Sequence, residues 1–208
     1  MPAPEWSEAF AGTLAPGDKP ALLLVDPVMA YVKKGSPLYL QSGQGAVDEM
    51  AKLLDAFRKA GLPVVFTNVK YEEGGADGGY FFKKVPALQL FVGNGPAGRF
   101  PPELQPRDGE AVLTKQYPSA FFDTGLSDML HDRGVDTVFV AGFSTSGCVR
   151  ASTLDALQSR FIPIVVVDAC ADRPEGPHEN NLHDLKAKYA ELATTDEAVA
   201  YVTQGATA

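Results

Sequence analysis

Cysteine is scarce in this sequence. Its two cysteines, Cys148 and Cys170, lie far apart without a CxxC spacing, which argues against a thioredoxin-type motif and a cysteine-rich zinc site. No stretch approaches the roughly 18 consecutive apolar residues that a membrane span requires. The N-terminal MPAPEWSEAF also lacks the basic start and apolar run of a secretory signal. We therefore expect a protein of the reducing cytoplasm without a membrane partner.

Basic residues and histidines are also few. The chain has 18 Lys and Arg against 26 Asp and Glu, a formal net charge of -8. Phosphate binding requires clustered Lys and Arg, which are missing here, so a nucleic-acid partner is not expected. His131, His178 and His183 show no ligand-like spacing beyond the weak i, i+5 pair of the last two. We predict no metal and no cofactor.

Apolar residues are abundant, at 45% of 208 residues, and the length favours a single domain over 1–208. Apolar runs rich in β-branched residues alternate with helical patterns. The runs cover 21–26, 63–68, 111–115, 137–142 and 163–168, with a short sixth expected at 191–194. The helical patterns cover about 44–60, 125–133, 148–161, the stretch after Pro177, and 196–202.

These runs are continuously apolar, which is typical of strands covered on both faces. Strands that alternate with helices imply right-handed crossovers and a parallel sheet. The sequence therefore predicts an α/β fold with three α-β-α layers and a doubly wound, mainly parallel sheet of five to six strands.

Two segments break the alternation. Residues 71–105 are rich in Gly, Pro and aromatics. A long irregular connection inside a compact domain is usually functional or disordered, so we expect a pocket rim, a lid or an oligomer contact. Residues 1–18 are expected to form an N-terminal arm.

Reactive side chains follow the predicted strands. Asp26 and Lys115 close two of the runs, while Cys148 and Arg173 follow two others after short turns. Ligands of open parallel sheets bind outside the carboxyl ends of the strands, where the winding direction reverses. We therefore expect these four side chains to converge on one rim.

Cys148 lies in GFSTSGCVRAST, where a strand ends, small residues turn the chain and a helical pattern begins. A helix N-terminus lowers the pKa of a thiol from about 8.5 toward neutrality, and its N–H groups can hold an oxyanion. The alternative is a small core residue. The sequence GFSTS lacks the final glycine of a nucleophile elbow, so a serine hydrolase is not expected.

The other three residues are each open to an ordinary interpretation. Asp26 can serve as the base that takes the thiol proton, or as a turn cap. Lys115 can stabilise the thiolate and the oxyanion, or lie on the surface. Arg173 can grip a substrate carboxylate with its forked guanidinium, or pair with Asp168, Asp172 or Glu175.

The stretches LLLVD, LTKQYPSAFFDTGL and VAGFSTSGCVRASTLDAL, taken in this order, resemble the isochorismatase-like cysteine hydrolases from about Ala21 onward. The phrases VDPVMAYV, SPLYL and DRPEGPHENNLHDLKAKYAE look most like the branch of N-carbamoylsarcosine and maleamate amidohydrolases. The resemblance implies a triad of Asp26, Lys115 and Cys148. It also implies homo-oligomers, often tetramers.

The resemblance further implies a cis peptide between Phe143 and Ser144, and an oxyanion hole of the Ser144 and Cys148 N–H groups. Arg173 matches the family's carboxylate-binding arginine, whereas Ser144 replaces a threonine. Metal-binding relatives use an Asp and histidines after the second strand, where this chain reads FTNVKYEE. We expect the substrate to contact Arg173, Ser144 and Phe143. Aromatic walls are expected from Tyr31, Tyr117 and Phe122.

These features predict a cysteine hydrolase that cleaves a small linear amide or N-carbamoyl compound through a thioester. The partner is then a small amide, with a carboxylate if Arg173 binds the ligand. A neutral ureido or lactam substrate is the alternative from the same chemistry. A non-catalytic protein that retains the fold, and a thiol redox sensor, are alternatives of other classes.

Overall fold

A parallel sheet of six strands forms the centre of the computed structural model, which describes residues 9–174 and 176–205. The strands are β1 (Pro20–Val25), β2 (Val64–Val69), β3 (Ala111–Lys115), β4 (Thr137–Phe143), β5 (Ile162–Ala171) and β6 (Glu191–Ala193). Their order is β3-β2-β1-β4-β5-β6, and every neighbouring pair is parallel. This arrangement confirms the predicted doubly wound α/β fold.

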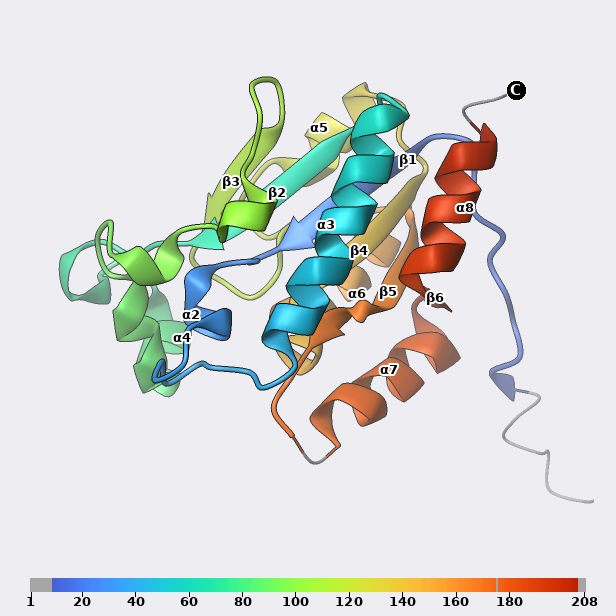
Figure 1. Cartoon of the computed structure of the whole chain (residues 1–208). Helices are drawn as coiled ribbons and strands as arrows, with labels where there is room; N and C mark the ends of the chain where they lie inside the picture. Colours follow the sequence, from blue (N-terminus) through green and yellow to red (C-terminus); the bar gives the residue numbers. More distant parts are fainter. Residues whose placement is uncertain (1–8, 175, 206–208) are drawn as a thin grey trace, which may run out of the picture.

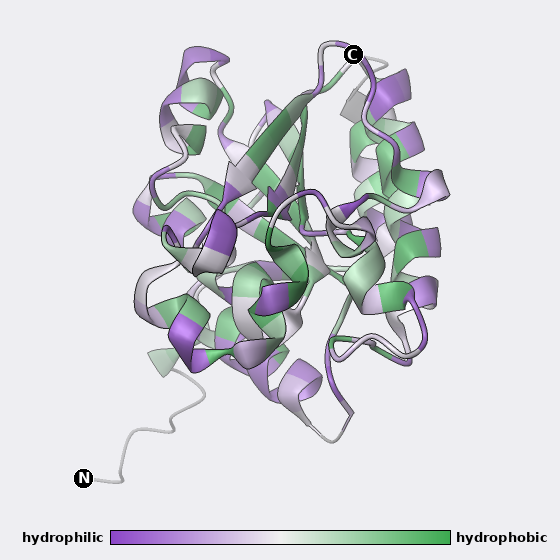
Figure 2. Ribbon diagram, turned by 90° about the vertical axis from the view of Figure 1, so that its left-hand side faces the viewer, coloured by the Kyte–Doolittle hydropathy of each residue, from purple (hydrophilic) through white to green (hydrophobic). Residues whose placement is uncertain are grey.

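Helices cover both faces of the sheet (Figure 1). One face carries α3 (Gly43–Lys59) and α8 (Thr195–Gly205), and the other carries α5 (Leu126–Asp132), α6 (Arg150–Gln158) and α7 (Pro177–Lys188). In β1, Leu22 and Leu24 join the apolar core under the first pair of helices, whereas Leu23 joins the core under the other three. Figure 2 shows hydrophobic residues along the central strands. Burial on both faces explains why these strands are continuously apolar.

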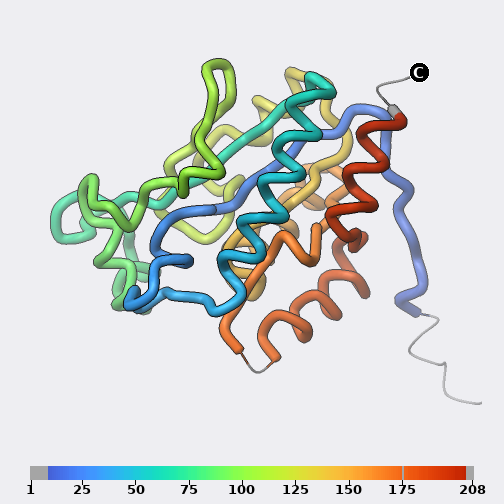
Figure 3. The backbone as a smooth tube through the Cα atoms, viewed as in Figure 1, coloured from blue at the N-terminus to red at the C-terminus, as the bar shows by residue number. Residues whose placement is uncertain are grey.

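Residues 71–105 connect β2 to β3 and extend beyond the end of β1 (Figure 3). They hold α4 (Gly79–Lys84) and short turns of 3-10 helix at Glu73–Gly75, Pro86–Phe91, Pro96–Gly98 and Pro102–Leu104. An isolated bridge between Tyr71 and Val92 closes part of the connection into a loop. The short α2 (Met29–Val32), just after β1, packs beside it. The segment is therefore irregular but held by its own contacts.

Two boundaries near the site differ from the sequence-based expectations. The strand expected at 163–168 continues to Ala171, after an irregular register between Val140 and Gly142 in β4. Asp168 accordingly lies inside β5, where its carboxylate accepts two hydrogen bonds from Thr195 at the start of α8. The helix expected from Cys148 begins at Arg150, after a π-helical turn.

The described part of the expected N-terminal arm is bound at the amino end of the central strand β4. The main-chain N–H of Gly17 donates to Thr137, and those of Asp18 and Lys19 donate to Asp136, at the start of β4. The first eight residues of the arm lie outside the described residues. Within 9–174 and 176–205, no helix is long and apolar enough to cross a bilayer.

The winding direction reverses between β1 and β4, which are neighbours in the sheet although β2 and β3 separate them in the chain. Gly142 pairs with Val25 there, with a φ of 129°, outside the range of ordinary L residues. A Cβ at Gly142 would collide with the Val25 carbonyl. A glycine therefore lets the two central strands end side by side.

We expect Gly142→Ala to lower the free energy of unfolding strongly, because the methyl group meets main chain that cannot move aside. Gly61→Ala is the matched control, since Gly61 also has a positive φ but open space around its Cα. Gly142→Ala should cost about 1–3 kcal/mol more than the control, as overpacking does. Urea denaturation of both variants measures the difference, and equal losses would contradict this role.

Candidate active site

Asp26, Lys115 and Cys148 meet at the carboxyl edge of the sheet. Asp26 follows β1, Lys115 ends β3, and Cys148 lies in the turn after β4. The Lys115 Nζ lies 2.7 Å from Asp26 Oδ2 and 3.4 Å from Cys148 Sγ. The strands β1 and β3 are two positions apart, about 10 Å, and the long lysine side chain spans this distance. The structure thus brings into contact three of the four residues that the sequence predicted to converge.

The carboxylate of Asp26 is fully buried and held from both sides. Lys115 donates to Oδ2, and Thr67 Oγ1 from β2 donates to Oδ1 at 2.7 Å. The same Thr67 oxygen accepts the main-chain N–H of Asp26, whose backbone has a positive φ of 48°. These contacts fix the carboxylate beside the sulfur. Thr67 was not identified from the sequence, although it is a polar residue in a run of apolar ones.

Cys148 as a whole residue is only 8% exposed. Burial raises its pKa to about 12; the Lys115 ammonium opposes this rise, whereas the negative charge of Asp26 and a hydrogen bond to it add to it. The expectation of a pKa lowered toward neutrality is therefore wrong. The reason is that α6 begins only at Arg150, so Cys148 lies in the π-helical turn before it and is desolvated.

Lys115 remains an ammonium ion despite its burial. Desolvation lowers its pKa, but the negative charge of Asp26 and the hydrogen bonds to Asp26 and Cys148 outweigh this effect, and the net change is upward. The Tyr117 carbonyl accepts a further hydrogen bond from Nζ at 3.1 Å. The resting site therefore contains a buried ion pair beside a neutral thiol.

The turn between β4 and α6 has a defined main-chain geometry. The peptide between Phe143 and Ser144 is cis, as the family resemblance implied. The Ser144 carbonyl accepts the N–H groups of Gly147 and Val149, at 2.9 and 3.2 Å. These bonds close the turn that carries Cys148 and fix the orientation of its main-chain groups.

A cavity of about 340 Å³ opens beside Cys148. Its walls are mostly apolar and include four residues predicted to bind substrate or react with it: Tyr31, Ser144, Cys148 and Arg173. Residues 71–105 contribute Phe81, Val85 and Leu88. Part of the segment that was expected as a pocket rim, a lid or an oligomer contact therefore lines the cavity.

Three residues expected at the substrate do not line this cavity. Phe143 is fully buried behind it, and its ring packs 5.1 Å from that of Tyr31. Tyr117 and Phe122 form an edge-to-face pair with ring centroids 5.0 Å apart, and Phe122 is 55% exposed. The main chain of Tyr117 nevertheless stays at the triad, because its carbonyl accepts the hydrogen bond from Lys115 Nζ.

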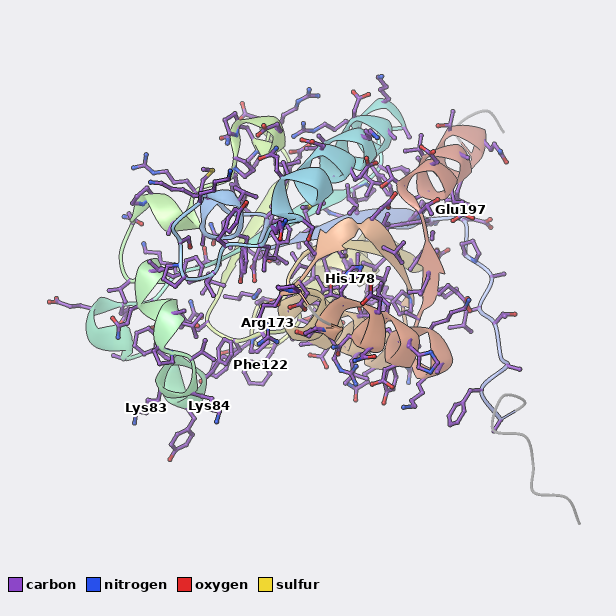
Figure 4. The ribbon with its side chains drawn as sticks, turned by 60° about the horizontal axis from the view of Figure 1, so that its bottom comes forward. Lys83, Lys84, Phe122, Arg173, His178 and Glu197 are labelled. Atoms are coloured by element: carbon purple, nitrogen blue, oxygen red, sulfur yellow. The ribbon has the colours of Figure 1, made fainter. Side chains whose placement is uncertain are left out.

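Arg173 stands at the mouth of the cavity with 71% of its side chain exposed. Its Nε lies 3.4 Å from Asp172 Oδ1, and its Nη2 lies 3.5 Å from Ser146 Oγ. In the view of Figure 4, Arg173 lies between α4, marked by Lys83 and Lys84, and the start of α7. Both contacts are long, so the guanidinium can turn to an anionic ligand.

Comparison with known protein families agrees with this geometry. The model of the isochorismatase domain matches residues 20–197. The chain belongs to the isochorismatase family. Among the described residues, no three His, Cys, Asp or Glu side chains group in a way that could hold a metal ion.

Individual members of the isochorismatase family are also similar to this chain. Maleamate amidohydrolase of Pseudomonas putida is 45% identical over 88% of this chain and 86% of its own length. N-carbamoylsarcosine amidase of an Arthrobacter species is 29% identical over 93% of this chain and 75% of its own. A solved cysteine hydrolase from Pseudomonas syringae pv. phaseolicola has a TM-score of 0.85 at 24% identity, over 90% of this chain and 94% of that one, and shares the fold.

Replacing Lys115 by Met should leave the Asp26 carboxylate buried and unpaired. Removing one partner of such a pair costs about 3–5 kcal/mol, and we expect that loss in the free energy of unfolding. The double variant Asp26→Asn with Lys115→Met buries no charge and should recover much of the loss. Chemical denaturation of the three proteins tests this, and a double variant no more stable than Lys115→Met would contradict it.

The Cys148 thiol should stay protonated at neutral pH in the free protein. Its pKa is raised to about 12, while an unfolded thiol titrates near about 8.5. Stability linked to this group is therefore complete below pH about 8.5 and falls as pH rises toward about 12. Thiolate absorbance at 240 nm, taken as wild type minus Cys148→Ala, should show no step near pH 7. A rise in thiolate absorbance near pH 7 would contradict the raised pKa and support the lowered thiol pKa that the sequence led us to expect.

Proposed function

We propose that this chain hydrolyses the C–N bond of a small carboxylate-bearing amide or N-carbamoyl compound through a thioester on Cys148. The chain is an amidohydrolase that acts on linear amides, as are its curated relatives. The contact of Lys115 Nζ with both Asp26 and Cys148 carries the mechanistic part. It joins a base and a cation to a nucleophile that lines the cavity.

Substrate recognition is assigned to Arg173 and the apolar walls. Its exposed guanidinium is the cationic group at the cavity mouth, and its ion pair with Asp172 is long, with 3.4 Å between Nε and Oδ1. A forked guanidinium binds a carboxylate through two parallel hydrogen bonds. Two curated relatives are named for maleamate and for N-carbamoylsarcosine. Each of these compounds carries a carboxylate and a terminal amide nitrogen. These observations favour an anionic over a neutral substrate.

Acylation begins with the neutral thiol. Asp26 takes the Sγ proton as sulfur attacks the carbonyl carbon, so negative charge moves from Asp26 to the carbonyl oxygen. The N–H groups of Ser144 and Cys148 hold that oxyanion, while Lys115 stabilises the sulfur. The C–N bond then breaks, the nitrogen takes the proton from Asp26, and ammonia leaves.

Deacylation uses the same groups in reverse. Asp26 takes a proton from a water molecule while the oxygen of that water attacks the thioester carbon. The C–S bond breaks, and the sulfur regains the proton from Asp26. The sum is amide plus water to carboxylic acid plus ammonia, with the protein restored. Each cycle therefore starts and ends with a protonated Cys148 thiol and an ionised Asp26 carboxylate.

The Cys148→Ser variant tests the nucleophile. Wild type, mixed briefly with maleamate or an N-carbamoyl amino acid, should release ammonia and show an acyl adduct on Cys148 by intact mass. Cys148→Ser should show no acyl adduct and no detectable burst of ammonia, because its kcat should be at least about 10³-fold lower than that of wild type. Equal turnover by the two proteins, without an adduct, would end the thioester proposal.

Arg173→Ala tests the carboxylate contact. We expect KM for carboxylate-bearing amides to rise about 10–100-fold, because a charged hydrogen bond contributes about 1.5–3 kcal/mol. The specificity constant for neutral amides should not change. Arg133→Ala, at the end of α5 and away from the cavity, is the matched control. An unchanged specificity constant for the anionic amides would favour a ureido or lactam substrate.

The cytoplasmic location and the oligomeric state, expected as a tetramer, stay predictions.

A further inference from the structure

The buried carboxylate of Asp172 has no part in the mechanism above, although it lies directly after β5 at the cavity. Its side chain is 0% exposed, and it lines the cavity beside Cys148. A buried charge requires close partners to offset its desolvation. Those partners indicate what Asp172 does.

Both oxygens of Asp172 accept main-chain N–H groups. Oδ2 accepts the Ser146 N–H at 2.5 Å, and Oδ1 accepts the Arg173 N–H at 2.7 Å. Ser146 lies midway between Ser144 and Cys148, whose N–H groups are the proposed oxyanion donors. One carboxylate thus connects the turn that carries the nucleophile to the residue that faces the substrate carboxylate.

The chain after β5, which begins with Asp172, makes a second contact with the turn that carries Cys148. The Thr145 hydroxyl is hydrogen-bonded to His178 Nδ1 at 2.8 Å, and Thr145 is fully buried. His178 belongs to the first turn of α7, labelled in Figure 4. The turn is held by its own main chain, because the Ser144 carbonyl accepts the Gly147 and Val149 N–H groups. It is also held by the side chains of Asp172 and His178, which follow β5.

We propose that Asp172 is a positioning residue of the amidase reaction, which holds the Ser146 N–H so that the neighbouring Ser144 and Cys148 N–H groups point at the oxyanion. The proposal rests on the function proposed above. Asp172 acts on the transition state through the turn, whereas Arg173 acts on the bound carboxylate. Oxyanion donors work because they are oriented before the reaction, and losing one costs about 10²–10³-fold in kcat.

Asp172→Asn tests this assignment, because the amide keeps the size of the side chain and one acceptor oxygen but cannot accept both N–H groups. We expect kcat to fall by about 10–100-fold, and by the same factor for carboxylate-bearing and neutral amides. KM should change by less than about threefold. Asp184→Asn is the matched control, since Asp184 lies on α7, pairs with Arg150 and Lys188, and does not line this cavity.

Alkylation of Cys148 by iodoacetamide separates positioning from collapse of the site. Displacement of iodide develops no oxyanion, so the alkylation rate of Asp172→Asn, followed by intact mass, should stay within about threefold of wild type. A parallel loss of alkylation and kcat would overturn the proposal, as would an unchanged kcat or an effect confined to KM of anionic amides. If Asp172→Asn does not fold, Asp172→Glu is put through the same two assays.

The proposed function and this inference fail in different ways. If wild type releases no ammonia from any amide and forms no adduct, the proposed function is wrong. If wild type is active and Asp172→Asn matches it in kcat, only the role of Asp172 is wrong.

Discussion

The buried ion pair between Asp26 and Lys115 is the interaction on which the rest of the site depends. Neither group is exposed, and each makes the burial of the other tolerable, because an unpaired charge would be strongly disfavoured there. The pair also sets the electrostatics at Cys148, where Lys115 lowers the pKa of the thiol and Asp26 raises it. Folding and reactivity are therefore linked through one contact between the ends of β1 and β3.

This contact requires the doubly wound order of the sheet. Reversal of the winding puts β1 beside β4, so that Asp26 and the turn carrying Cys148 lie next to each other. On the other side of β1, β2 supplies Thr67 to the second oxygen of Asp26. Each strand on this side of the switch thus contributes one side chain, and Gly142 lets the central strands end close together.

Much of this arrangement could be predicted from the sequence. Continuous apolar runs identified the strands, and polar residues at their ends identified Asp26, Lys115 and Cys148, because parallel strands bring their carboxyl ends to one edge. The thiol pKa was mispredicted because a helix dipole can be inferred from the sequence, whereas desolvation depends on packing. Thr67 and Asp172 were missed for a related reason: their roles come from strand register and from a hydrogen bond between residues 26 apart. Tyr117 and Phe122 do not line the cavity, and sequence alone does not give the direction in which the chain continues after β3.

The position of β3 has a further consequence. It is one of the two edge strands of the sheet and is bonded to β2 alone, and two of its five residues, Val112 and Thr114, are exposed. Edge strands with solvent on one side are the first parts of a sheet to fray. Fraying of β3 would withdraw Lys115 while β1, β4 and both apolar cores remain intact, leaving a folded but inert protein. Heat inactivation would then precede melting, and the lifetime of the enzyme would depend on how firmly this one edge strand is held.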